Sequence, residues 1–212
     1  MTAVGAYRLE IVYPEKSPGS FSPMSSALEK PDLTDLRQIG FINSARVFVS
    51  AALQAEVEEA KEAGGLPSGT VYHCTSSKAL PRIAEQKAIL CSREARQIYG
   101  ELETGEIAHT RTNEWPPREL DDIYAHRSIS SSYFFGDSSE YPVNFGLQDV
   151  SVQDAFGDGL RLGPKVSLDA VTSVVVPHDQ LTATYEWVAE NCSPGTLAIS
   201  QYAASLLISL PN

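Results

Sequence analysis

Short stretches of alternating apolar and polar residues recur along the chain, which is the pattern of strands with one buried face. The first stretch reads YRLEIVY, and the longest, VSLDAVTSVVVP, is rich in β-branched side chains. The strands predicted in this way are residues 7–13, 71–76, 89–91, 128–135 and 166–177.

Apolar residues at helical spacing predict three helices. The longest covers residues 32 to about 63, where Gly64 and Gly65 would end it, and its charged stretch 56–62 is interpreted as a solvated face. Shorter helices are predicted at residues 78–87 and 182–191. The apolar tail, residues 196–210, is compatible with a helix or a strand.

The order of these elements indicates one core with an appended N-terminal part. Residues 1–66 would form an N-terminal strand and helical element, and residues 67–212 the core. Seven acidic residues, two arginines and Pro116-Pro117 crowd residues 101–122, so an exposed insertion is predicted at about 100–124. Long insertions of this kind are often functional.

Composition and charge narrow the class of protein. The chain has 212 residues, 42% hydrophobic and 20% charged, as globular proteins do, and a net charge of −11 disfavours nucleic acid as a partner. Neither a signal peptide nor a membrane-spanning run is visible, which predicts a cytoplasmic protein, or one delivered into a target cell without a classical signal. Three widely spaced cysteines favour reduced thiols.

The predicted strand at residues 71–76 carries a polar motif. It reads Tyr72-His73-Cys74-Thr75, and the helix after it contains Leu80-Pro81-Arg82-Ile83. About 60 residues later Ser132-Tyr133-Phe134-Phe135 ends another predicted strand, and Tyr141 follows a polar turn. In this order the motifs resemble the His–Tyr–Glu class of ADP-ribosyltransferases, which includes diphtheria-type toxins, poly(ADP-ribose) polymerases and rifamycin-modifying transferases.

The resemblance implies a role for each motif residue. His73 would hydrogen-bond a ribose hydroxyl, Thr75 would orient His73 or contact the ribose, and Tyr133 and Tyr141 would stack on the nicotinamide. The backbone at Cys74, where the family has glycine, would contact the carboxamide. The catalytic residues implied are His73, Tyr133 and Gln201, and the NAD-binding residues are Tyr72, Cys74, Thr75, Ser132, Phe134 and Tyr141.

A late glutamate is the third motif of the family, where it stabilises the ribosyl cation. The strand at 166–177 has no glutamate, and the closest pattern, Ile199-Ser200-Gln201-Tyr202, puts Gln201 at that position. Glutamine can hydrogen-bond a ribose hydroxyl but brings no negative charge. Asp154, Asp158 and Asp169 are the alternative sources of charge.

The fold implied by the resemblance is α+β, with a split core of two small, mainly antiparallel sheets that hold NAD between them. The predicted activity is transfer of ADP-ribose from NAD, which is a substrate, to an acceptor with release of nicotinamide; NAD hydrolysis is a neighbouring reaction, and no metal is required. The acidic surface favours a protein acceptor. Two alternatives are a non-catalytic NAD- or partner-binding module and a toxin that modifies DNA or RNA.

The same residues also have structural interpretations. Tyr133, Phe134 and Phe135 are compatible with core residues of a half-buried strand, and Tyr141 with a residue that covers the turn. A strand-end histidine such as His73 is more often structural when considered alone. A thiol nucleophile at Cys74 is disfavoured because neighbouring strand residues point to opposite faces. The remaining histidines stand too far apart in the sequence for a helical zinc pair, and no glycine-rich phosphate loop is present.

Overall fold

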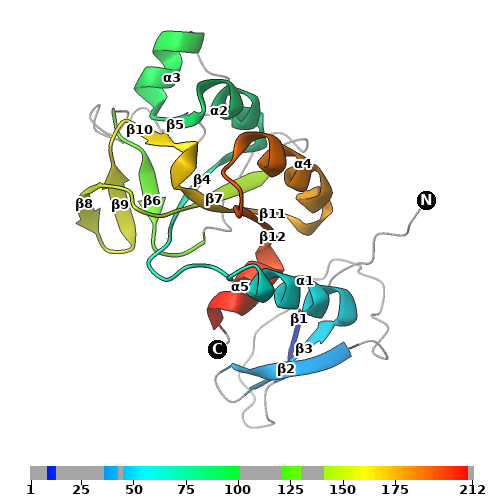
Figure 1. Ribbon diagram of the computed structural model, residues 1–212. Coiled ribbons are helices and arrows are strands. Elements are labelled where there is room, and N and C mark those ends of the chain that lie inside the picture. Colours follow the sequence, from blue (N-terminus) through cyan, green and yellow to red (C-terminus); the bar gives the residue numbers. More distant parts are fainter. Residues whose placement is uncertain (1–8, 13–35, 43–44, 101–120, 130–140, 210–212) are drawn as a thin grey trace, which may run out of the picture.

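The computed structural model describes residues 9–12, 36–42, 45–100, 121–129 and 141–209. Its architecture is mixed α+β, as predicted, with a seven-stranded sheet at the centre and helices on both faces (Figure 1). A two-stranded and a three-stranded sheet accompany it. The described core therefore contains one large sheet and one small one, where two small sheets were expected.

The seven-stranded sheet has the strand order β12-β11-β7-β4-β6-β9-β8. All neighbouring strands are antiparallel except β11 and β12, which run parallel. Consequently β4, β11 and β12 end at the same edge of the sheet. The strands are β4 (Val71–Ser76), β6 (Tyr124–His126), β7 (Pro142–Leu147), β8 (Val152–Phe156), β9 (Gly159–Leu162), β11 (Val171–Val176) and β12 (Leu197–Ser200).

One face of this sheet packs against the larger apolar cluster. Alternate residues of β7 and β11, such as Phe145 and Val174, point into it and are fully buried. Helices α2 and α4 and the pair β5–β10 contribute Ile83, Val188 and Ile89. The elements are η2 (Ser77–Ala79), α2 (Leu80–Gln86), β5 (Ala88–Leu90), α3 (Ser92–Tyr99), β10 (Lys165–Ser167), η5 (Leu168–Ala170), η6 (His178–Gln180) and α4 (Leu181–Asn191).

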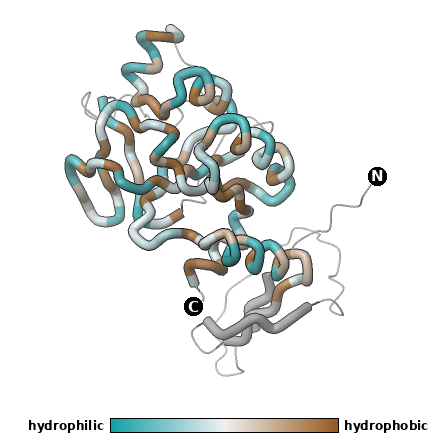
Figure 2. The backbone as a smooth tube through the Cα atoms, viewed as in Figure 1, coloured by the Kyte–Doolittle hydropathy of each residue, from teal (hydrophilic) through white to brown (hydrophobic). Residues whose placement is uncertain are grey.

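The opposite face is covered by α1 (Ala51–Glu62) and α5 (Gln201–Ser209), which lie side by side (Figure 1). Leu53 and Val57 of α1 and Leu206 of α5 join Val175 and Ile199 of the sheet in a second apolar cluster. Figure 2 shows apolar residues along the central strands of the sheet and along α5. Helix α1 therefore packs on the core, although the sequence suggested a boundary at residue 66.

The N-terminal part differs from the prediction. Strand β1 (Leu9–Val12) lies within the predicted strand at 7–13, but the predicted helix from residue 32 is wrong over its first half, which forms β2 (Leu36–Ile42) and β3 (Ala45–Ser50). These strands make an antiparallel sheet of order β1-β3-β2. β-Branched and aromatic residues in the Arg-Val-Phe-Val stretch favour strand over helix, which outweighed the apolar spacing.

Both ends of α1 follow known capping rules. The Oγ of Ser50 accepts a hydrogen bond from the Leu53 N–H at 3.2 Å, as an N-cap does. At the other end Gly64 and Gly65 have positive φ angles of 102° and 68°, and the Gly65 N–H donates to the Ala60 carbonyl at 2.8 Å. The glycine stop predicted for this helix is confirmed.

Replacing Ser50 with alanine should lower the free energy of unfolding by about 1 kcal/mol, because the Leu53 N–H loses its partner. Urea denaturation followed by circular dichroism would measure the change. The exposed Ser151 gives a matched control, since Ser151→Ala should stay within about 0.5 kcal/mol of the wild type. Equal losses in the two variants would contradict the capping role.

Later segments are partly as predicted. The helices expected at 78–87 and 182–191 correspond to η2 with α2 and to α4. The single strand expected at 166–177 is wrong, because η5 separates β10 from β11. The tail, for which a helix or a strand was expected, contains both. Ser128 and Ile129 are not in a strand, and the rest of that predicted strand lies outside the described residues, as does most of the predicted insertion.

Candidate functional site

Strand β4 lies near the middle of the sheet, hydrogen-bonded to β7 along its whole length and to β6 at Tyr72. Because side chains alternate along a strand, His73 and Thr75 share a face with Val71, which belongs to the larger apolar cluster. Tyr72 and Cys74 point to the opposite face, where α1 and α5 lie. The motif is therefore divided between the two faces of the sheet.

His73 is held in one orientation by β6. Its Nδ1 lies 2.7 Å from the carbonyl oxygen of Tyr124. Since a carbonyl only accepts, Nδ1 must carry the proton, and in the neutral ring Nε2 is then an acceptor. Burial lowers the pKa of His73, the Tyr124 carbonyl raises it, and nearby His126 lowers it further, with a net decrease from the usual 6.5. His73 is thus neutral at pH 7, with Nε2 able to accept a hydrogen bond.

This lowered pKa predicts a pH-dependent stability. When the folded state resists protonation, the unfolded state binds more protons below about pH 6.5, so the free energy of unfolding should fall as the pH drops from 6.5 toward the folded-state pKa. Above pH 6.5 His73 is neutral in both the folded and the unfolded state, so its contribution to the free energy of unfolding no longer changes with pH. Urea denaturation at several pH values would show the slope, and His73→Gln should reduce it. His178, whose pKa burial also lowers, would account for part of the slope that remains. An unchanged slope in the variant would contradict the prediction.

Tyr141 lies at the end of β4. The Ser77 N–H donates to the Tyr141 carbonyl at 3.0 Å, and the Tyr141 N–H donates to the Ser77 Oγ at 3.2 Å. Its partly buried side chain packs against the same apolar cluster that His73 faces, and this burial raises its pKa. The structure thus brings Tyr141 to the end of the strand that carries His73 and Thr75.

Cys74 has the properties of a structural thiol. Its side chain is buried, and burial raises the pKa of the thiol to about 12, so the thiolate required of a nucleophile does not form at neutral pH. Tyr72 is buried with the apolar residues of α1 and α5. Both residues, assigned to NAD binding by the resemblance, have side chains on the face opposite His73.

Gln201 begins α5, directly after β12. Strands β7 and β11 lie between β12 and β4, so three strand spacings, about 14 Å, separate Gln201 from the β4 motif across the sheet. The two positions are at the same edge, because β4 and β12 run in the same direction. The Nε2 of Gln201 is buried and has no hydrogen-bond partner.

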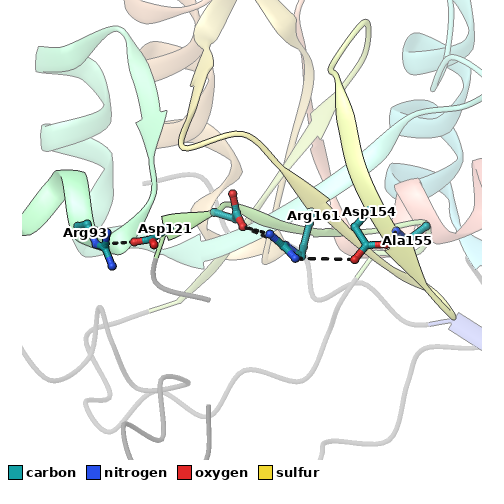
Figure 3. Close-up of polar contacts among 6 residues, drawn as sticks. Arg93, Asp121, Asp154, Ala155 and Arg161 are labelled. Atoms are coloured by element: carbon teal, nitrogen blue, oxygen red, sulfur yellow. Dashed lines mark hydrogen bonds and ion pairs between the residues drawn. The ribbon is translucent and has the colours of Figure 1, made fainter. Parts of the chain in front are cut away.

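The three candidate aspartates are exposed and interact with nearby side chains. Asp154 lies 3.7 Å from Arg161, which also binds Asp122 through Nε at 2.9 Å (Figure 3). Asp158 accepts a hydrogen bond from Ser128 at 2.6 Å, and Asp169 accepts one from Ser167 at 3.0 Å. None of these described contacts involves the His73 face of β4.

Three residues of the resemblance, Ser132, Tyr133 and Phe134, lie outside the described residues. Within the described ranges, His, Cys, Asp and Glu side chains do not gather in threes as metal ligands would. No helix in the same ranges is long and apolar enough to cross a membrane.

Sequence reasoning missed Glu56 and Asn144. Glu56 is 8% exposed and Asn144 is fully buried, both on the α1/α5 side of the sheet. Glu56 was assigned to a solvated face, yet its spacing from Leu53 and Ala60 places it on the buried face of the helix. Asn144 lies between Val143 and Phe145 in β7, so its side chain points to the face opposite that of these two apolar residues. This alternation is the one sequence signal that could have placed Asn144 on the α1/α5 side of the sheet.

The comparisons with known proteins identify no relative. No protein-family model matches the chain, and neither the curated proteins nor the solved structures contain a match.

Proposed function

We propose that the protein is an NAD-dependent ADP-ribosyltransferase that moves ADP-ribose from NAD to an acceptor and releases nicotinamide. The observation that carries the proposal is the state of His73. Its hydrogen bond to the Tyr124 carbonyl and its lowered pKa make Nε2 an acceptor at neutral pH. An acceptor held at a fixed position within β4 suits a ribose hydroxyl, which donates.

The reaction requires little chemistry from the side chains. The bond between the nicotinamide nitrogen and the ribose C1′ breaks, and its electron pair leaves with nicotinamide, whose positive charge is thereby neutralised. The acceptor forms a new bond to C1′ and loses its proton to solvent. His73 would hold the ribose, and Tyr141 with Tyr133 would contact the nicotinamide ring, so that binding energy orients the reacting atoms.

The acceptor is proposed to be a protein. The chain carries a net charge of −11, and such a surface repels the phosphates of nucleic acid. A split core of two sheets that holds NAD between them remains part of the proposal, with the His73 face of β4 as one wall.

A non-catalytic NAD- or partner-binding module is the second candidate. The position of Gln201 favours it, because an uncharged side chain about 14 Å from the β4 motif across three strand spacings cannot stabilise a cation held at His73. In that case His73 would bind the ribose without any transfer.

The test is to incubate the full chain with NAD and measure nicotinamide release and NAD binding separately. We expect release above the spontaneous rate, reduced about a hundredfold by His73→Ala and by Tyr133→Ala, as for loss of a positioning contact in the transition state. Tyr185→Ala, at a tyrosine that is 44% exposed on α4, is the matched control and should keep the wild-type rate. Nicotinamide release at the background rate would contradict the proposed transferase activity. NAD binding without nicotinamide release would instead support the non-catalytic binding module.

A further inference from the structure

Helix α5 is capped at its start by groups from two distant parts of the chain. Ser200 is the N-cap residue, because its Oγ accepts a hydrogen bond from the Ala203 N–H at 3.2 Å. The Ser200 N–H in turn donates to Oε1 of Glu56, in α1, at 2.7 Å. In an ordinary capping box this second acceptor is a glutamate or glutamine at the position of Ala203. That position is fully buried among apolar residues here, and α1 supplies the acceptor instead.

The Glu56 carboxylate is held away from water at this junction. Glu56 is 8% exposed, and its Oε2 has no hydrogen-bond partner among the described residues. The first turn of α5 favours a negative charge at Ser200 through the helix dipole. His178 also interacts electrostatically with Glu56, because η6 follows β11 at the edge where Val176 pairs with Ser200. The hydrogen bond between Glu56 and Ser200, here called the clip, therefore joins α1 to the start of α5.

Two features weaken the attachment of α1 and α5 to the sheet. Beneath these helices Asn144 of β7 and Ser173 of β11 are fully buried, and within the described ranges their side-chain polar atoms have no hydrogen-bond partner. Burying such groups is costly, and water would satisfy them if the helices moved away. In addition, α5 follows β12, which stands at one end of the strand order and pairs there with β11 over four residues. Both features favour a local opening of this layer.

We propose that α1 and α5 form one cover that opens and closes as a unit over this face of the sheet, with the Glu56–Ser200 clip as its fastening. When α1 moves away, the N-cap of α5 loses its acceptor, and when α5 unfolds, the Glu56 carboxylate loses its donor. Each helix therefore stabilises the other. The cover lies on the face opposite His73, so it does not depend on the transferase activity proposed there.

Hydrogen exchange of the full chain, followed by mass spectrometry at about pH 7.5, tests the cover. At this pH His178 is neutral, because burial lowers its pKa from the usual 6.5 although the charges of Glu56 and Asp179 raise it. We expect the amides of α1 and α5 to be protected to a similar degree, and less than those of β7 and β11. Equal protection of the two helices and these central strands would overturn the cover.

Substitutions of Glu56 test the clip. Glu56→Ala should speed exchange in both α1 and α5 about tenfold or more, because the Ser200 N–H loses its acceptor, and should leave β7 unchanged. Glu56→Gln keeps an acceptor oxygen and should have a smaller effect. Glu59→Ala, at an exposed position of the same helix, is the matched control and should exchange like the wild type. Faster exchange confined to α1 would show that the two helices are not coupled.

Two further variants test the causes separately. Ser173→Ala removes a buried hydroxyl without adding volume and should slow exchange in α1 and α5 about fivefold, whereas unchanged or faster exchange would contradict the proposed weakening. His178→Gln removes the imidazole beside Glu56 but leaves the Ser200 contact, so exchange in α5 should stay close to that of the wild type. An increase as large as that of Glu56→Ala would assign the coupling to His178 and overturn the clip.

Discussion

Replacing Phe145 with alanine should lower the free energy of unfolding by about 3–5 kcal/mol, the largest effect expected from a single substitution in this chain. Phe145 is fully buried in β7, between β4 and β11, where it pairs with His73 and Val174. Its ring also contacts Trp187 of α4, with centroids 5.9 Å apart and planes inclined at 57°. The truncation would leave a cavity where sheet and helix meet, because the strands on either side hold the backbone in place.

Urea denaturation monitored by tryptophan fluorescence and by circular dichroism would measure this loss. Ile98 on α3 is 51% exposed, and Ile98→Ala is the matched control, expected within about 0.5 kcal/mol of the wild type. A loss below about 1 kcal/mol for Phe145→Ala would mean that β7 is not the centre of the core.

Replacing Gly146 with alanine should cost about 2–3 kcal/mol although it adds one methyl group. A Cβ at this position would overlap the Oγ of Ser173, and it would lie 3.0 Å from Cγ2 of Thr70 and 3.4 Å from Cε1 of Tyr72. Ser173 is fully buried and Tyr72 nearly so, which restricts how far these neighbours can move away.

A double-mutant cycle in urea would test the cause. If the overlap with Ser173 dominates, Ser173→Ala should recover at least half of the loss in the Gly146→Ala background. Gly163 supplies the control, since a Cβ there would meet only Nε2 of Gln153 at 3.5 Å and Gly163→Ala should be nearly neutral. Independent, additive effects of the Gly146 and Ser173 changes would contradict the steric explanation.

The fold could be predicted where local signals agreed. Ser50, Gly64 and Gly65 mark the ends of α1 through capping chemistry, so the end of that helix was predictable. The hairpin β2–β3 was not, because its apolar residues also fit a helical spacing. The strand order could not be predicted from the sequence, because no local pattern indicates that β4 lies between β6 and β7 or that β12 pairs with β11.

The candidate site could likewise be predicted only where a local sequence signal existed. Alternation along β4 correctly implied that His73 and Cys74 point to opposite faces. The hydrogen bond from His73 to the Tyr124 carbonyl joins residues 51 positions apart and left no local signal. The roles assigned to His73, Tyr141 and Gln201 in NAD binding and catalysis stay predictions.

The contact between Glu56 and Ser200 joins residues 144 positions apart in the sequence. The apolar stripe of α1, with Leu53 and Val57, is covered by β12 and α5, which follow it far along the chain. During synthesis this stripe therefore stays without its cover until β12 and α5 have been made, and contacts of such long range form slowly. A chain that stops before α5 would leave this apolar stripe exposed to water, where it favours association between chains.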